Sequence, residues 1–425
     1  MKYQEFHFKD YSFEPSTGVL SLTYGYDNAL TFTETFKFAF ALSDYDPAVL
    51  DRACQLVFFM CGVSYYKAYL APKIIIDKGE LDQTAAEFFA KTYQNGLGEF
   101  FYVNKLDPHT KVPFAATTTS PEAPLTATGK GLLLGVGGGK DSLVTIEQLR
   151  SVPDAATWSV NHRSQLEPLV EVIGLPHYWV ERTWDLQLQE LNKADAYNGH
   201  IPISAIFACV GTVTAILSGH QDVVVSNENS ANEPTLHYQG VDINHQYSKS
   251  LAFEQDFQAL LKHNFGDSLR YYSFLRPLSE VYIAELFAKT GFEKYKSVFS
   301  SCNRAFTHDS HHIFWCCHCP KCAFTFLAFT PFIEQAELEQ LFGKNLLLDP
   351  ELEPTYRQLL GIEGDKPLEC VGEVKESRAA MHLAQKTYPE LAKYQFELPD
   401  DYDYRALASH SMPADMYELL QKALL

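Results

Sequence analysis

The sequence lacks any long basic run and carries few positive charges for its length. Its 425 residues include 34 Lys and Arg against 53 Asp and Glu, which gives a formal net charge of −19. An acidic chain repels the phosphate backbone of nucleic acids unless its few cations are strongly clustered. The composition therefore argues against a nucleic-acid partner, while a local pocket for a small anionic substrate stays open.

Long apolar runs are missing as well. The first residues, 1–6, contain no apolar core of the kind that a signal peptide needs, and no stretch reaches the roughly 20 uninterrupted apolar residues of a membrane helix. Five of the nine cysteines fall between Cys302 and Cys322, a spacing that suits a metal better than a disulfide framework. These features predict a cytoplasmic protein with no membrane partner. The oligomeric state cannot be read from them.

Apolar residues are plentiful, at 46% with 14% aromatics, so sizeable cores are expected. A chain of this length is expected to form two or three packed units. Alternating segments and two helical stretches predict an α+β N-terminal domain over residues 1–128. A catalytic domain that includes the cysteine cluster is predicted over 129–330, and a mostly helical region over 331–425. The small, polar, Pro-containing segment 115–124 marks the first boundary.

Strands alternate with helices from about residue 129 onward. Short apolar runs predict strands, and amphipathic stretches between them predict helices. Such alternation predicts an α/β fold with a parallel sheet covered on both faces. The expected strands are 131–136, 157–160, 178–180, 222–225 and 270–275, and the expected helices end near 150, 173, 218 and 289.

A glycine loop lies between the first of these strands and its helix. Successive glycines let the backbone approach a ligand closely, and the following helix start offers unpaired N–H groups and a positive dipole end. A serine adds a hydroxyl, and an aspartate can cap the turn or help to hold magnesium. The loop therefore predicts a pyrophosphate cradle made of Gly137, Gly138, Gly139, Lys140, Asp141 and Ser142.

Other interpretations of this loop fit less well. The dinucleotide pattern GxGxxG fails because Ser142 occupies the place of its last glycine. The Walker A pattern fails because Asp141 follows Lys140, where a Ser or Thr is required. A tight strand-to-helix turn with a solvated Lys140 is the remaining alternative.

The cysteine cluster offers the ligands of a closed tetrahedral zinc site, which takes four thiolates. The candidate ligands are Cys302, Cys316, Cys319 and Cys322. Cys317 is an extra thiol, and alternative ligands are His308, His311, His312 and His318. A set of reduced buried thiols, or an iron–sulfur cluster, is also compatible with the spacing.

The glycine loop resembles the SGGxDS signature of the PP-loop ATP-pyrophosphatases, with Gly137 in place of the usual Ser. The resemblance covers about residues 130–325 and implies a HUP-type nucleotide-binding domain that cleaves ATP between its α- and β-phosphates. It places Ser159 and Asn161 near adenine, and Ser226, Asn227 and Glu228 near the reacting phosphate or substrate. The cysteine pattern resembles the zinc site of the PP-loop 7-cyano-7-deazaguanine synthases.

The combination of features is similar to the UDP-N-acetylmuramoyl-L-alanyl-L-glutamate epimerases, the MurL family. The similarity rests on the N-terminal unit, the glycine loop, the segments 198–205 and 226–233, and Cys302-Asn303-Arg304 ahead of the CxxCxxC. It implies an isomerase of cell-wall peptidoglycan synthesis that uses ATP and magnesium. The enzyme would adenylate the terminal L-glutamate of UDP-MurNAc-L-Ala-L-Glu, a small-molecule substrate, and invert it to D-glutamate.

Within this resemblance several residues are candidates for the chemistry. Arg276 and Arg304 are candidates for binding substrate carboxylates or phosphates, with structural ion pairs as the alternative. The candidate bases are His200 and Glu228, and Asp141 is a possible magnesium ligand. Cys209 is a possible acid/base partner or, in mid-helix, a core residue.

Two other classes of function remain open. One is another PP-loop enzyme, either a deazapurine nitrile synthase or a tRNA-modifying enzyme, although the acidic charge argues against tRNA. The other is a non-catalytic nucleotide sensor, which would bind ATP without releasing pyrophosphate. A glutamine-dependent amidotransferase is not expected, because the first cysteine is Cys54.

Overall fold

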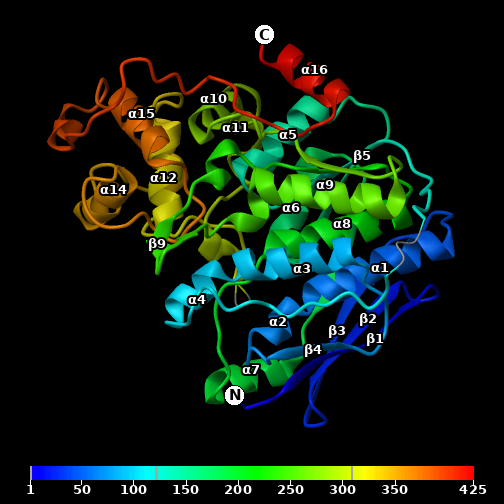
Figure 1. Ribbon diagram of the computed structural model, residues 1–425. Helices are drawn as coiled ribbons and strands as arrows, with labels where there is room; N and C mark the ends of the chain where they lie inside the picture. The colour runs from blue at the N-terminus through cyan, green and yellow to red at the C-terminus, as the bar shows by residue number, and fades with distance from the viewer. Residues whose placement is uncertain (1, 120–122, 308–309) are drawn as a thin grey trace.

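The computed structural model of the chain describes residues 2–119, 123–307 and 310–425. One large sheet is built from strands that lie between residues 5 and 273 (Figure 1). Its nine strands lie in the order β11-β8-β5-β6-β7-β3-β2-β1-β4, and β9 (Leu236–Tyr238) and β10 (Val241–Ile243) form a separate hairpin. The mixed α/β class predicted from the sequence is confirmed.

Five neighbouring strands of this sheet run parallel and form its parallel half. In chain order they are β5 (Leu132–Gly135), β6 (Ala155–Val160), β7 (His177–Thr183), β8 (Asp222–Val225) and β11 (Arg270–Ser273). The first strand, β5, lies between the second and the fourth, so the winding reverses between β5 and β8. Open α/β sheets bind ligands at such a switch point, beyond the carboxyl ends of the strands.

Helices cover both faces of the parallel half, as the apolar strands require. Leu133 packs into a core with α8 (Ile203–Ser218) and α9 (Leu251–Phe265). Leu132 and Leu134 point to the opposite face, where their core includes α5 (Lys140–Leu149) and α10 (Glu280–Thr290). All five strands expected from residue 129 onward are present. The connecting helices are α6 (Arg163–Ile173), α7 (Leu186–Ala194) and α11 (Phe292–Tyr295).

The other four strands form what we call the antiparallel half of the sheet. Its strands pair antiparallel, except that the edge strand β4 pairs parallel with β1. They are β1 (Glu5–Glu14), β2 (Val19–Tyr26), β3 (Leu30–Phe38) and β4 (Lys73–Ile76). Helix α1 (Pro47–Cys61) packs on β1; Asp46 Oδ1 caps its start by accepting from Ala48 N at 2.8 Å. The neighbouring helices are α2 (Val63–Tyr66), α3 (Gln83–Gly96) and α4 (Gly98–Val103).

The two halves meet where β3 pairs antiparallel with β7, from Thr35 opposite Thr183 to Phe38 opposite Val180. At this seam the Arg182 guanidinium forms a buried ion pair with Glu34. The sheet is therefore continuous from the N-terminal segment into the strands that follow the glycine loop. The division of the chain at residues 128 and 330 stays a prediction.

The regular elements of the C-terminal part of the chain are helices, as expected, although less than half of residues 331–425 lies in them. Helices α12, α14 and α15 form a lobe beside the parallel half, coloured yellow to orange in Figure 1. The bounds are α12 (Pro320–Phe329), α13 (Gln335–Phe342), α14 (Glu353–Leu359), α15 (Val374–Ala384) and α16 (Ala414–Ala423).

The helical stretch Pro47–Tyr66 is long and apolar enough to cross a membrane by length and composition. Its most apolar window is 78% buried inside the protein, where α1 packs against α8. Core helices of soluble proteins pass the same test.

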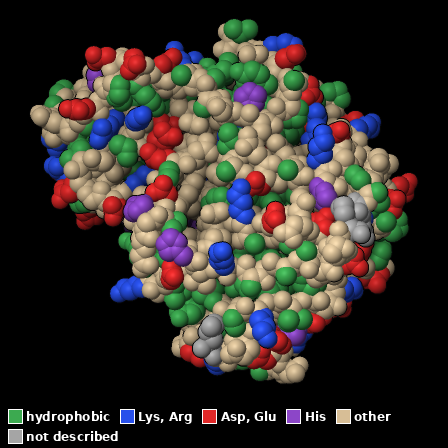
Figure 2. Space-filling model, in the orientation of Figure 1, with side chains coloured by type: hydrophobic (Ala, Val, Ile, Leu, Met, Phe, Trp, Pro, Cys, Tyr) green, Lys and Arg blue, Asp and Glu red, His purple; other side chains and the backbone are tan. Residues whose placement is uncertain are grey.

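Figure 2 shows acidic and basic side chains interspersed over one face of the molecule. The absence of a nucleic-acid partner stays a prediction.

Candidate functional site at the carboxyl ends of the parallel strands

The glycine loop joins β5 to α5, and the space beside Gly137 is open. A Cβ atom added at Gly137 would meet nothing within 4 Å. Gly138 has φ 86°, and a Cβ there would lie 2.4 Å from the Phe306 ring, so a side chain is excluded. Helix α5 begins without a side-chain cap, which leaves N–H groups of its first turn available to an anion.

The segment that precedes Cys302 packs directly on this loop. Ser300 N donates to Gly138 O at 3.1 Å, and Lys140 N donates to Ser301 Oγ at 3.4 Å. Within the loop, Ser142 Oγ donates to Gly139 O at 3.0 Å. The loop is thus held on one side by its own helix and on the other by the chain leading into the cysteine cluster.

Lys140 is turned away from solvent. Its side chain is 2% exposed and forms ion pairs with Asp141 and with Glu280, the first residue of α10. These carboxylates raise the pKa of Lys140 although its burial acts in the opposite direction. The alternative of a simple turn with a solvated lysine does not describe this structure.

Three carboxylates converge beside the loop and form what we call the acid cluster: Asp141, Glu228 and Glu280. One oxygen of each lies within 4.8 Å of those of the other two. They follow β5, β8 and β11, three adjacent strands of the parallel half. Glu280 Oε1 is buried without a hydrogen-bond partner. Since carboxylate oxygens are the preferred ligands of Mg²⁺, these residues fit a divalent cation.

The cluster is electrically asymmetric. Burial and the neighbouring Glu280 raise the pKa of Glu228 above its ordinary value. Burial also opposes ionisation of Glu280, but Lys140 and Lys321 outweigh it and lower its pKa. Lys321 Nζ lies 3.7 Å from Glu280 Oε1. Glu280 is thus held as the anion, while Glu228 takes up a proton more readily than an exposed carboxylate.

The two candidate substrate-binding arginines lie in different environments. Arg276 is fully buried; it pairs with Glu254 at 2.9 Å and donates to Glu228 O at 2.7 Å and to Lys249 O. It therefore positions the backbone that carries Glu228. Arg304 contacts the ring of His318 near the surface. Substrate binding by either arginine stays a prediction.

The predicted nucleotide contacts lie on the same edge of the sheet, and the side chains of Ser159, Asn161 and Ser226 are already paired. Ser159 Oγ lies 3.0 Å from His177 Nε2, and Asn161 Nδ2 donates to Arg182 O at 3.1 Å. Ser226 Oγ donates to Thr145 Oγ1 at 2.8 Å, and Asn227 O accepts from Ser273 Oγ at 2.6 Å. Their roles toward a nucleotide stay predictions.

His200, a candidate base, belongs to a different group from the acid cluster, with Glu99 and His245. Its Nδ1 is 3.5 Å from Glu99 Oε2, and its ring centroid is 4.7 Å from that of His245. Burial and the charge of His245 lower the pKa of His200 to about 4. His200 is therefore a neutral imidazole near pH 7. Cys209, the other thiol considered, is fully buried in α8.

The four predicted zinc ligands converge. The sulfur atoms of Cys302, Cys316, Cys319 and Cys322 all lie within 4.8 Å of one another, and none is in a disulfide. Cys316 and Cys322 are 3.7 Å apart, close to the roughly 3.8 Å expected between two thiolates on one tetrahedral zinc with bonds of about 2.3 Å. These residues fit zinc, which stays a prediction.

None of the alternative ligands that the structure describes joins this group. The Cys317 thiol donates to Phe342 O at 3.1 Å instead of joining the group. His318 Nδ1 lies 2.6 Å from Cys316 O. His308 lies outside the described residues.

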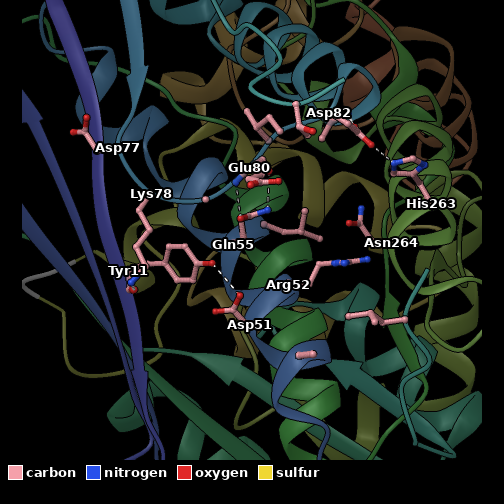
Figure 3. Close-up of a pocket in the computed structure, with 17 residues that line it drawn as sticks. Tyr11, Asp51, Arg52, Gln55, Asp77, Lys78, Glu80, Asp82, His263 and Asn264 are labelled. Carbon is pink, nitrogen blue, oxygen red and sulfur yellow. Dashed lines mark hydrogen bonds and ion pairs between the residues drawn. The ribbon is translucent and has the colours of Figure 1, made fainter. Parts of the chain in front are cut away.

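A separate hollow in the antiparallel half, shown in Figure 3, contains none of the predicted site residues. Charged and aromatic groups on its wall pair with one another or with neighbours: Asp82 with His263, Tyr11 with Asp51 at 3.2 Å, and Lys78 with Asp10 at 2.7 Å. It lies away from the carboxyl ends of the parallel strands. We therefore assign the candidate site to the switch point.

Fold and site together define a doubly wound α/β protein with a glycine loop and a group of three carboxylates at the switch point. Two family models match the chain, the MurL N-terminal domain over residues 1–274 and the MurL C-terminal domain over residues 298–395. The chain therefore belongs to the MurL family.

Curated relatives agree with this assignment. A protein of Xanthomonas oryzae pv. oryzae is 40% identical over 88% of this chain and 84% of its own length. A protein of Salinispora tropica is 40% identical over 89% and 84%, and one of Micromonospora sp. is 39% identical over 89% and 86%. All three are named UDP-N-acetyl-alpha-D-muramoyl-L-alanyl-L-glutamate epimerase.

Several residues of the site escaped sequence reasoning: Lys249, Glu280, Lys321, Glu99 and His245. They belong to several segments of the chain, and only Lys321 lies in a recognisable motif, between Cys319 and Cys322 of the cysteine cluster. The one available signal was the position of Glu280, at a predicted helix start after the fifth strand, where a carboxylate is common for capping reasons alone.

Proposed function

We propose that the chain is an ATP-dependent epimerase of peptidoglycan precursor synthesis. It inverts the terminal L-glutamate of UDP-MurNAc-L-Ala-L-Glu to D-glutamate and releases AMP and pyrophosphate. Family membership supports the substrate and the inversion, because relatives of 39–40% identity carry that name. The observation that carries the use of ATP is the acid cluster beside the glycine loop. We assign the parallel half of the sheet, with its covering helices, to the PP-loop class of HUP-type domains.

The chemistry explains why an epimerase would consume ATP. The α-proton beside an ionised carboxylate is very weakly acidic, because its removal creates a dianion. Transfer of AMP to the carboxylate removes that charge and makes the carbonyl an electron sink. A base can then take the proton, and reprotonation on the other face inverts the centre. Hydrolysis of the acyl-adenylate releases AMP.

The residues of the switch point would divide this work. The glycine loop and the first turn of α5 would bind the pyrophosphate portion of ATP through backbone N–H groups. Asp141, Glu228 and Glu280 would hold Mg²⁺, which offsets phosphate charge in such reactions. Lys140 and Lys321 keep Glu280 ionised for that task.

The four cysteines would hold a structural zinc, because four protein ligands leave no open position for water. Their contribution to catalysis would be indirect, because the nearby Ser300 and Ser301 form hydrogen bonds with the glycine loop. A cytoplasmic location is part of the same proposal.

The decisive test is incubation with UDP-MurNAc-L-Ala-L-Glu, ATP and Mg²⁺, followed by hydrolysis and chiral analysis of glutamate. We expect D-glutamate, with AMP and pyrophosphate, and none of them when ATP is omitted. Glutamate that stays entirely L would refute the epimerase. Inversion without pyrophosphate release would refute the adenylation mechanism alone.

A further inference from the structure

Cys370 stands apart from the four-cysteine group and faces the candidate site. It lies between α14 and α15 and is half-buried. Lys249 Nζ lies 3.3 Å from its sulfur, and the His245 imidazole is close enough to lower the pKa of the thiol. A thiol between an ammonium and an imidazole is in the surroundings that favour thiolate.

A third group orients the histidine. Glu99 forms a hydrogen bond with His245 Nδ1, so a carboxylate, an imidazole and a thiol stand in series. This is the arrangement in which a reactive group is activated by a neighbour that is itself held in place. Glu99 lies on α4, and His245 follows β10, so the series brings together segments distant in sequence.

The electrostatics agree with this geometry. Burial alone would raise the pKa of the Cys370 thiol, but Lys249, His245 and Lys321 lower it to about 7. Burial would lower the pKa of His245, yet the neighbouring Cys370 and Glu99 raise it to about 9. Between those values the pair exists as thiolate and imidazolium.

This thiol adjoins the acid cluster. Lys249 interacts electrostatically with Cys370 and also with Glu228 and Asp141, so its ammonium lies near both groups. Arg276 ties the two together, because it donates to the backbone oxygens of Glu228 and Lys249. A carboxylate activated at the cluster would therefore have its neighbouring carbon near Cys370.

We propose that Cys370 is the catalytic residue that removes or returns the α-proton of the activated glutamate, with His245 and Glu99 as positioning residues. The assignment rests on the proposed function. The sulfur lone pair forms an S–H bond as the Cα–H bond breaks, and the Cα–H electrons move into the acyl-adenylate carbonyl. A proton from water then reaches the opposite face, and the thiol returns its own proton to solvent.

The other candidate bases are less suited to this step. His200 has a pKa of about 4, which makes it a weak base. The Cys209 thiol is fully buried, and burial raises its pKa. Glu228 belongs to the acid cluster, where a cation would compete for its lone pairs. Cys370 differs from these three because the Lys249 ammonium, 3.3 Å from its sulfur, stabilises its anion.

The first experiment separates activation from inversion in the full-length chain. Cys370→Ala is assayed for substrate-dependent pyrophosphate release and, in D₂O, for deuterium entry at Cα. Pyrophosphate release should stay within about threefold of wild type, while deuterium entry falls by roughly 10²- to 10⁴-fold, the usual contribution of a general base. Cys54→Ala, which removes a buried thiol of α1, is the control and should keep both activities.

The outcomes separate this assignment from the proposed function. Deuterium entry near the wild-type rate in Cys370→Ala would refute the role of Cys370 and leave the epimerase standing. Joint loss of pyrophosphate release and exchange, with a native unfolding transition, would also refute it, because the thiol would then act in activation. A wild-type chain that releases no pyrophosphate overturns both.

A pH profile adds a measurement that a purely structural role would not alter. In wild type, exchange should rise with pH through about 7, as Cys370 loses its proton and becomes the thiolate base. His245→Gln should move the rising limb to higher pH, because the thiolate loses its imidazolium neighbour. A rising limb unchanged in His245→Gln would refute the series.

The unmodified chain offers a test that needs no variant. Iodoacetamide should alkylate Cys370 with a rate that rises through about pH 7, and saturating UDP-MurNAc-L-Ala-L-Glu should slow that reaction at least tenfold. Peptide mass spectrometry assigns the modified residue. Alkylation of Cys370 that is unaffected by substrate would place the thiol outside the site.

Discussion

The two halves of the sheet differ in the side chains that their strands bring together. In the parallel half, three adjacent strands are followed by Asp141, Glu228 and Glu280, which meet at one edge. The antiparallel half instead delivers aromatic side chains to a core. Tyr24 stacks on Phe58 with ring centroids 5.4 Å apart, and its hydroxyl donates to Phe58 O at 2.8 Å.

The contrast follows from strand direction. Parallel neighbours end at the same edge, so residues far apart in sequence can assemble a polar site there. Antiparallel neighbours alternate in direction, and their ends are joined by short turns. The parallel half is therefore expected to govern activity, and the antiparallel half to govern stability. The predictions below test this division from the largest expected effect to the smallest.

The largest effect is expected at the seam. Arg182→Met should lower the free energy of unfolding by about 3–5 kcal/mol, because it leaves Glu34 charged and buried without its partner. Urea denaturation measures the change. The double variant Glu34→Leu/Arg182→Met should recover most of the loss, since it removes both charges. A single variant as stable as wild type would show that the pair does not secure the seam.

Asp141→Asn should lower the rate of ATP cleavage about 10²- to 10³-fold with little change in stability, because it weakens the charge that would hold Mg²⁺ near the loop. Pyrophosphate release at saturating substrate is the measurement. Asp154→Asn removes a carboxylate that pairs with Lys130 on the surface, and it should leave the rate unchanged. Equal rates in the two variants would contradict a role for the acid cluster in ATP cleavage.

Cys316→Ser should reduce bound zinc and raise the KM for ATP by roughly 3- to 30-fold, a coupling of about 0.5–2 kcal/mol. The cysteine group holds the segment whose Ser300 and Ser301 contact the glycine loop. Metal analysis by mass spectrometry and initial rates against ATP are the measurements. Cys317→Ser removes the neighbouring thiol outside the group and should change neither. Full zinc content in Cys316→Ser would contradict the ligand set.

Tyr24→Phe should cost about 1 kcal/mol of stability, because it removes one buried hydrogen bond and leaves Phe58 O without that donor. The urea midpoint should fall while the epimerase rate per folded molecule stays constant. A change in rate without a change in stability would break the proposed division of labour between the halves.

Local patterns were sufficient to predict much of this molecule. The strand–loop–helix unit around Gly137 to Ser142 could be predicted because its residues are adjacent in sequence. The cysteine group could be predicted because a zinc site needs four ligands, and Cys302 with the CxxCxxC segment supplies four. The partners of Asp141 and Glu228 could not be predicted in the same way. Glu280 and Lys249 reach them only through the order of strands and the packing of α9 and α10, which no periodicity encodes.

His200 illustrates the same limit. Its residue type suggested a base, but the neighbours that set its basicity, Glu99 and His245, come from α4 and from the chain after β10. The pairing of β3 with β7 was equally inaccessible, because registers between distant strands depend on the complete topology.

That pairing also constrains how such a chain can be shortened or recombined. Without β3, strand β7 becomes an outer strand and presents a row of backbone donors and acceptors to any other chain with a free edge. Arg182 would face solvent and lose its counter-charge at the same moment. A catalytic fragment without residues 1–128 would thus have an exposed edge strand that is prone to aggregate. A homologue that lacks these residues would need another segment to cover β7.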